Sequence, residues 1–163
     1  MSFFKDKCLT QTTSKEFGIR DGVPNQPAII DEENNETWLA HVNNNDELQL
    51  GFYAIDNCIV FNNENGNKYS TCDAAIKHEN QQLFFIELKD RKSSGWLSKA
   101  TSQLKSTLDL YKEYETSLTD RIECYVCNPQ RPSAPASALG LLKSFKQETG
   151  YKLNVNHQIS IQK

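Results

Sequence analysis

The fold is decided by residues 71–90, which read TCDAAIKHENQQLFFIELKD. Two apolar runs, at 71–76 and 83–90, are rich in strand-forming residues, and a polar link at 78–82 separates them. Runs of this kind bury well on a sheet, whereas the polar link between them does not. The sequence therefore predicts a β-hairpin, with the link as its turn.

Charged residues gather at one end of the predicted hairpin. Asp73 lies in the first strand, and the second strand ends in an acid, an apolar residue and a base: Glu87, Leu88 and Lys89. Because side chains alternate along a strand, Glu87 and Lys89 share one face and Leu88 takes the other. If the hairpin closes with Asp73 beside Glu87, two carboxylates and an ammonium group meet at one end of a sheet. A bound cation would relieve that arrangement, since neighbouring carboxylates in a partly desolvated site disfavour each other's ionisation.

A hard divalent cation suits such a pair of carboxylates. Mg²⁺, or Mn²⁺ in its place, takes carboxylate oxygens, backbone carbonyls and waters that a substrate phosphate can displace. We expect Asp73, Glu87 and the backbone carbonyl of Leu88 as its ligands. The expected chemistry is metal-assisted hydrolysis of a phosphodiester, in which Lys89 orients the water or stabilises developing negative charge. The alternative is structural: Asp73 braces a turn, and Glu87 and Lys89 form an ordinary ion pair.

These residues resemble the signature of the PD-(D/E)XK nuclease superfamily, which is an acid on one strand and acid-x-lysine on the next. Asp73 matches the first acid and Glu87, Leu88 and Lys89 match the second element, while Cys72 stands where the name-giving proline would be. The resemblance implies a single α/β domain with a restriction-endonuclease-like core, a mixed central β-sheet flanked by helices. It also implies a metal-dependent nuclease, with DNA as the expected nucleic acid.

In many members of this superfamily, a helix before the hairpin adds another acid to the metal site. The resemblance makes Asp56 the first candidate for that metal ligand and Glu47 the second. Residues 47–61 alternate at first like a strand and then keep helical spacing, so we expect a strand that passes into a short helix. The alternative role for Asp56 is to cap a helical turn.

An amphipathic helix is predicted after the hairpin. Apolar residues recur at three- and four-residue steps over residues 96–115, with lysines elsewhere around the helix. Gln103 lies beside this apolar stripe, and Gln103 and Leu104 followed by Tyr111 resemble the Gln-Leu…Tyr element of RecB-like members of the superfamily. That likeness implies that Gln103 reaches the metal site or a phosphate. The alternative is a glutamine on the helix surface.

The charge of the chain is unevenly distributed. The net charge of −3 is unfavourable for binding phosphates, but residues 1–60 hold ten acids against four bases. Residues 87–112 hold six bases against three acids, and residues 131–163 hold five against one. We expect the basic segments to form a local footprint for a phosphate backbone, unless they are simply solvated helix faces. The residues expected to bind nucleic acid are Arg91, Lys92 and Lys99.

The rest of the chain completes an α/β pattern. A strand at 121–127 after the helix makes a βαβ unit, whose crossover length predicts parallel strands. A second helix over 136–148 and a final edge strand within 151–161 follow. Before the hairpin we expect loops over 1–36 with one short strand at 28–30, and a half-buried strand at 37–42.

These elements predict one domain over residues 1–163. It divides into an amino-terminal extension (1–47), the core motif region (48–127), and a carboxy-terminal helix and strand (128–163). The length and the hydrophobic content of 37% suit a single core. Small nucleases of this kind often act as homodimers, and the carboxy-terminal helix is a candidate dimer surface.

Five scattered cysteines predict reduced thiols rather than a disulfide framework. Cys124 and Cys127 lack a second ligand pair for zinc, and on a strand they would point to opposite faces. With no apolar span and no signal peptide in the sequence, we expect a cytoplasmic protein and no membrane partner. A second function is open: a non-catalytic member of the same fold, an immunity or inhibitor protein, that blocks a basic partner with its acidic amino-terminal third.

Overall fold

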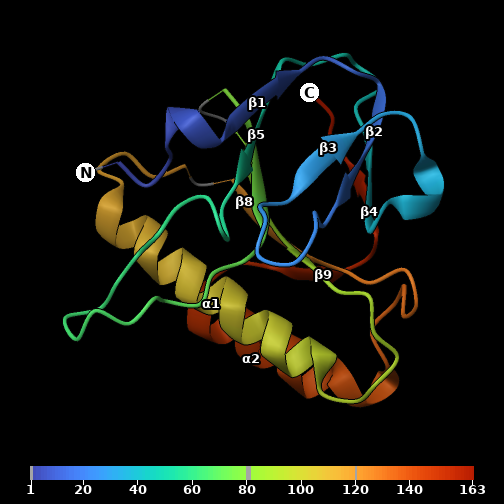
Figure 1. The fold of residues 1–163 in the computed structure, drawn as a ribbon. Coiled ribbons are helices and arrows are strands. Elements are labelled where there is room, and N and C mark those ends of the chain that lie inside the picture. The colour runs from blue at the N-terminus through green and yellow to red at the C-terminus, as the bar shows by residue number, and fades with distance from the viewer. Residues whose placement is uncertain (1, 80–81, 120) are drawn as a thin grey trace.

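The central sheet has six strands in the order β1-β5-β6-β7-β8-β9 (Figure 1). The computed structural model describes residues 2–79, 82–119 and 121–163. Pairing is antiparallel from β1 to β7 and parallel from β7 to β9. The strands are β1 (Leu9–Thr12), β5 (Leu50–Ala54), β6 (Ala74–His78), β7 (Gln82–Leu88), β8 (Ile122–Cys127) and β9 (Leu153–Val155).

The predicted hairpin is present as β6 and β7. Ala74 pairs with Ile86, and the register continues to His78 opposite Gln82. Asn80 and Gln81 of the predicted link lie outside the described residues. Every residue of β7 from Leu83 to Leu88 is buried, because both faces of this central strand are covered.

A second sheet has four strands in the order β10-β4-β2-β3. Its strands are β2 (Glu16–Arg20), β3 (Ile29–Asp31), β4 (Ala40–Asn43) and β10 (Gln158–Ser160). The helices are α1 (Trp96–Tyr114) and α2 (Leu139–Thr149), with three short 3-10 turns at η1 (Asp6–Cys8), η2 (Asn35–Thr37) and η3 (Ala136–Ala138). The predicted βαβ unit is confirmed, since β7 and β8 are parallel and α1 joins them.

The elements form three layers, with the six-stranded sheet in the middle (Figure 1). One core lies between this sheet and the two helices, and it contains Phe85 of β7 and Leu104 of α1. The other core lies between the two sheets, where Phe84 and Ile86 of β7 share a cluster with Phe17 of β2. Alternate residues of β7 therefore serve different cores, as the pleat of a strand requires.

The predicted mixed central sheet is present, and both helices cover the same face of it. The second sheet covers the other face, and three of its four strands lie within residues 16–43, most of which were expected to be loops. Residues 1–47 thus contribute β1 to the central sheet and β2, β3 and β4 to the second sheet. Strands such as β1 and β3 are only three or four residues long, so their alternation is too brief to stand out in the sequence.

Two other expected elements differ from the structure. After β5 the chain makes a turn rather than a short helix, and Asn57 in that turn has a φ of 63°. The expected final edge strand is divided between β9, at the edge of the central sheet, and β10, at the edge of the second sheet. A single alternating stretch cannot show in sequence that its halves join different sheets.

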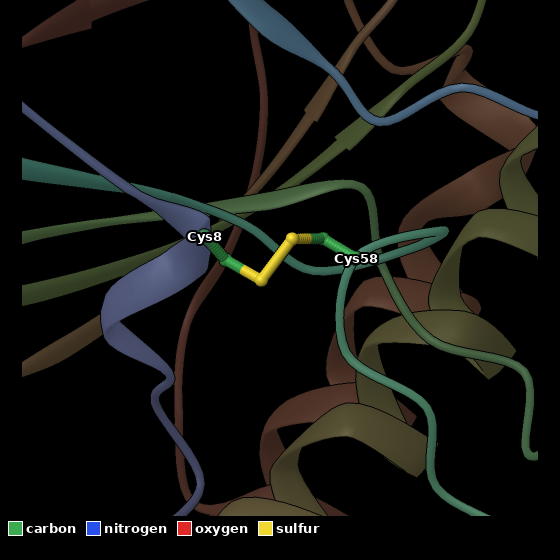
Figure 2. The surroundings of a disulfide bond; sticks show 2 residues. All are labelled: Cys8 and Cys58. Atoms are coloured by element: carbon green, nitrogen blue, oxygen red, sulfur yellow. A yellow bond between two sulfur atoms is a disulfide. The ribbon is translucent and has the colours of Figure 1, made fainter.

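A disulfide joins Cys8 to Cys58, so the prediction that all five cysteines are reduced is wrong (Figure 2). The two residues are 50 positions apart in sequence. Antiparallel pairing of β1 with β5 sets Leu9 opposite Tyr53, which brings the end of η1 beside the turn after β5. Cys72, Cys124 and Cys127 are free and buried.

Cys124 and Cys127 belong to the two different cores, as expected for residues three positions apart on one strand. No helix among the described residues is both long and apolar enough to cross a bilayer.

Candidate active site

The predicted site residues meet in a cavity of about 270 Å³ at the carboxyl end of β7. Asp73 directly precedes β6, Glu87 is the penultimate residue of β7, and Lys89 follows that strand. Gln103 comes from α1, which packs on the face of the central sheet that carries Phe85 of β7. The residues that line this cavity are Asp21, Asp73, Glu87, Leu88, Lys89, Asp90, Arg91, Lys99 and Gln103.

The hairpin places the two predicted acids side by side. Ala74 pairs with Ile86 in the antiparallel register. Asp73, one residue before Ala74, therefore lies opposite Glu87, one residue after Ile86. The backbone N–H of Leu88 donates to Oδ2 of Asp73 at 2.7 Å, which fixes that carboxyl against the end of β7. Leu88 packs in the core between the sheets, so its neighbours along the strand face the α1 side.

Lys89 is held between two side chains. Its Nζ lies 2.7 Å from Oε1 of Glu87 and donates to Oε1 of Gln103 at 2.9 Å. Gln103 is itself fixed, because its Nε2 donates to the backbone carbonyl of Thr71 at 3.2 Å. Gln103 therefore positions the ammonium group through direct contact, and Lys89 is only 9% exposed.

Glu87 is the most deeply buried member of the cluster, with 1% of its surface exposed. Its Oε1 is paired with Lys89, but its Oε2 has no hydrogen-bond partner among the described residues. A buried carboxylate oxygen without a donor costs free energy comparable to a lost hydrogen bond to a charged group, about 1–3 kcal/mol or more. Such an atom is an available ligand for a cation.

Burial dominates the protonation of both acids. It raises the pKa of Asp73 to about 7; the Leu88 N–H and Lys89 oppose the rise and Asp21 adds to it. Burial also raises the pKa of Glu87, with a further increase from the Asp73 carboxylate and a decrease from Lys89. Without a bound metal, both carboxyl groups therefore keep their protons to a higher pH than an exposed acid does.

Asp21 is a site residue that the sequence analysis missed. It follows β2, lines the same cavity as Asp73 and Glu87, and has a pKa that burial raises and Lys89 lowers. It comes from the second sheet, whose strands were not predicted in this segment. The available signal was the alternating stretch at 16–20 followed by an acid and a glycine, a pattern typical of a strand that ends in a turn.

Asp56 lies in a neighbouring cavity rather than beside Glu87. That cavity of about 320 Å³ is lined by Asp56 together with Asp21 and Asp73. Oδ1 of Asp56 accepts from Nζ of Lys68 at 2.6 Å, and its Oδ2 accepts from the side-chain amide of Asn57 at 3.0 Å. Both oxygens are thus occupied by local donors.

The three residues predicted to bind nucleic acid lie around the cluster. Arg91 and Lys99 line the same cavity as Glu87, and Lys92 lines a larger cavity of about 550 Å³ beside it. All three are exposed. Their charges are consequently available to a substrate near the buried acids.

The arrangement fits a magnesium-like ion better than an ion that needs many protein ligands. No group of three or more His, Cys, Asp or Glu residues within 2–79, 82–119 and 121–163 is placed to hold a metal. Mg²⁺, however, is usually bound through one or two carboxylates plus waters and phosphate oxygens. Asp73 and the unpartnered Oε2 of Glu87 supply that donor set. Comparison of the chain with protein-family models, curated proteins and solved structures gives no match.

Proposed function

We propose that this protein is a divalent-metal-dependent nuclease that hydrolyses phosphodiester bonds, with DNA as its expected substrate. The observation that carries the proposal is the buried Glu87, whose one oxygen is paired with Lys89 while the other has no partner in the described structure. Asp73 beside it supplies a second carboxylate. Two acids and a lysine converge where strand β7 leaves the sheet, an edge that favours ligand sites in α/β proteins.

An ordinary ion pair at a strand end explains this arrangement less well. Such pairs are exposed and contribute little to stability, whereas Lys89 and Glu87 are 9% and 1% exposed. Burying them beside another carboxyl is unfavourable without further compensation. Clusters of this kind are typical of functional sites, where strongly shifted pKa values accompany a cleft.

Each residue has a distinct role in the proposed reaction. Mg²⁺ or Mn²⁺ held by Asp73, Glu87 and the Leu88 carbonyl would supply Lewis-acid stabilisation of the phosphate and a more acidic water. Lys89 presents its ammonium group to the attacking water or to a phosphate oxygen. Gln103 keeps that ammonium group in place through the 2.9 Å contact.

The test combines metal binding with cleavage on the same samples. Mg²⁺ and Mn²⁺ are titrated calorimetrically into the wild type, Asp73→Asn and Glu87→Gln, and plasmid and single-stranded DNA are offered as substrates. Asp109→Asn on the exposed side of α1 is the control, since it removes one carboxylate away from the cavity. We expect the wild type and the control to bind metal and cleave, and both site variants to lose both activities.

Absence of metal binding and of cleavage in the wild type would overturn the proposal. The acidic amino-terminal third would then become the surface of interest, with a basic protein partner as the ligand to seek.

A further inference from the structure

A second cavity, of about 550 Å³, lies beside the proposed active site and has no role in it. Two loops form it: the one that follows β7 and the one that follows β8, together with the start of α1. Its lining residues are Lys92, Ser93, Ser94, Trp96, Gln130, Arg131, Pro132, Ser133, Ala134 and Pro135. The volume is within the range of cavities that hold small ligands.

Hydrogen bonds tie the two loops of this cavity together. The side-chain amide of Asn128, which is 1% exposed, donates to the carbonyl of Arg91 at 2.8 Å. The Gln130 amide donates to Oδ1 of Asp90 at 2.6 Å, and Nη2 of Arg131 donates to the carbonyl of Lys92 at 3.3 Å. The cavity is therefore built into the structure rather than left between two independent loops.

The same contacts fix the cavity relative to the catalytic lysine. The N–H of Lys89 donates to the carbonyl of Cys127 at 2.8 Å. Cys127 directly precedes Asn128, whose side chain ties the two loops together. Arg91 lines the cavity that holds Glu87, and the next residue, Lys92, lines the larger one. A strand of substrate that contacts both residues would pass from one cavity to the other.

The lining combines the chemistry of a phosphate site with that of a base site. Lys92 and Arg131 are cationic, none of the described lining residues is an acid, and three serines add hydroxyl groups. Trp96, which is 8% exposed, and three other apolar residues also line the cavity and give it apolar surface that a base can contact. The first turn of α1 has neither a capping side chain nor an acid, so its positive end is compatible with a phosphate.

We infer that this cavity binds one unpaired nucleotide of the substrate strand, next to the phosphodiester that is cleaved. This inference rests on the proposed nuclease function and specifies its substrate class. A base within a duplex is covered by its partner and its stacked neighbours, so it must be flipped out of the duplex, at the cost of unpairing and unstacking, before it can enter a cavity between two loops. A single strand, or an unpaired end or flap, avoids that cost and is the substrate class that we infer.

Binding is measured without metal, so that it is separate from cleavage. Fluorescein-labelled single-stranded and duplex DNA of equal length are titrated into the wild type in EDTA, and anisotropy is followed. The test variant is Lys92→Gln with Arg131→Gln. The control is Lys7→Gln with Lys15→Gln, which removes the same charge from exposed positions outside both basic segments and away from both cavities.

We expect the wild type and the control to bind the single strand about tenfold or more tightly than the test variant does. Duplex DNA should bind weakly to all three. A second readout uses Trp38→Phe, which leaves Trp96 as the sole tryptophan of the chain. Its fluorescence should be quenched by the single strand and unchanged by the duplex, because Trp96 lines the cavity and only a base that enters the cavity comes near the indole.

Four results would contradict either the nucleotide-binding role of the cavity or the proposed nuclease function. Equal single-strand binding by the test and control variants, or unquenched Trp96 fluorescence, would contradict the role of the cavity. Cleavage that depends on Asp73 and Glu87 would still support the nuclease function in that case. Equally tight binding of free dTMP and of the single strand would make this a free-nucleotide site. Single-strand binding in the cavity without metal-dependent cleavage by the wild type would support the cavity and overturn the nuclease.

Discussion

At the residue scale, the central question is how an ammonium group stays in place beside a buried carboxylate. Lys89 contacts Oε1 of Glu87 and Oε1 of Gln103, and Gln103 is anchored to the backbone of Thr71. Gln103 comes from α1, Glu87 from β7 and Lys89 from the position directly after β7, so the geometry depends on how α1 packs on β7. Gln103 is accordingly a positioning residue.

Replacing Gln103 by Leu should leave metal affinity within twofold and lower kcat about ten- to hundredfold, because Lys89 loses one of its two contacts. Gln103→Glu, which keeps an acceptor for the ammonium group, should recover part of the rate. Steady-state cleavage kinetics and metal titration check this. Ser102→Ala, on the exposed side of the same helix, is the control, and an unchanged kcat for Gln103→Leu would contradict the role.

Asp73 should make the metal-free protein less stable as the pH rises. Its pKa is about 7 in the folded state against an ordinary value of 3.8, so between these values the folded protein holds a proton that the unfolded chain has released. The free energy of unfolding therefore falls across that window, and Glu87 acts in the same direction.

Urea unfolding in EDTA at about pH 5 and about pH 8 measures this effect. We expect a smaller decline for Asp73→Asn than for the wild type, and no such difference for Asp109→Asn on the exposed side of α1. Parallel declines in all three proteins would show that Asp73 has an ordinary pKa in the folded state.

Asp21→Asn should lower cleavage about tenfold or more, since it removes a carboxylate near the two proposed metal ligands, Asp73 and Glu87. The free energy of unfolding of this variant should not fall. Burial raises the pKa of Asp21 because it disfavours the ionised carboxylate, and a neutral amide avoids that cost. Thermal unfolding in EDTA and cleavage rates at saturating Mg²⁺ separate the two effects. Wild-type activity in this variant would exclude Asp21 from the site.

At the element scale, β7 combines two functions through its alternation. Phe84, Ile86 and Leu88 pack between the sheets, while Phe85 packs under α1. Glu87 follows Phe85 on the α1 side and emerges where the packing ends. A one-residue shift of register would send Glu87 into the core between the sheets, so the apolar pattern of the strand also fixes the face on which Glu87 lies.

The Cys8–Cys58 disulfide should stabilise the fold by about 2–4 kcal/mol, because it constrains a long loop of the unfolded chain. Cys8→Ala with Cys58→Ala, compared with the wild type by urea unfolding, measures the loss. Wild type unfolded in a reductant is the matched control, since it breaks the bond without changing a side chain. A loss below about 0.5 kcal/mol in reductant would show that the bond contributes little.

At the scale of the whole molecule, the amino-terminal third is indispensable to both cores. Phe3 packs in the core under the helices, and Phe17, Ile19 and Val42 pack between the sheets, all with 0% exposure. Each such side chain contributes about 1.5–3 kcal/mol on burial, and a domain of this size has only about 5–15 kcal/mol of net stability.

A protein that begins at residue 48 should therefore not fold. It lacks β1 to β4 and Asp21, and we expect no cooperative thermal transition by far-ultraviolet circular dichroism and no metal binding. Supplying residues 1–47 as a separate peptide provides the control, since recovery would show that the missing contacts were the cause. A cooperative transition in the shortened chain would contradict the integrated fold.

The sequence by itself determined the local elements and the residues along them. The hairpin, the helix at 96–114 and the strand after it follow from periodicity within single segments, and that periodicity also put Glu87 and Lys89 on one face. Such patterns can be recognised without knowing which other segment packs against them, because they depend only on which side chains of one segment are apolar.

Only the tertiary structure decided which segments meet. The second sheet, the disulfide and the arrival of Asp21 at the site all join residues that are far apart in the chain. Short strands with similar alternation are interchangeable in sequence, and the burial of the whole core selects among their pairings. Asp21 lacks a local signal for this reason: its position depends on a sheet whose formation requires contacts from both ends of the chain.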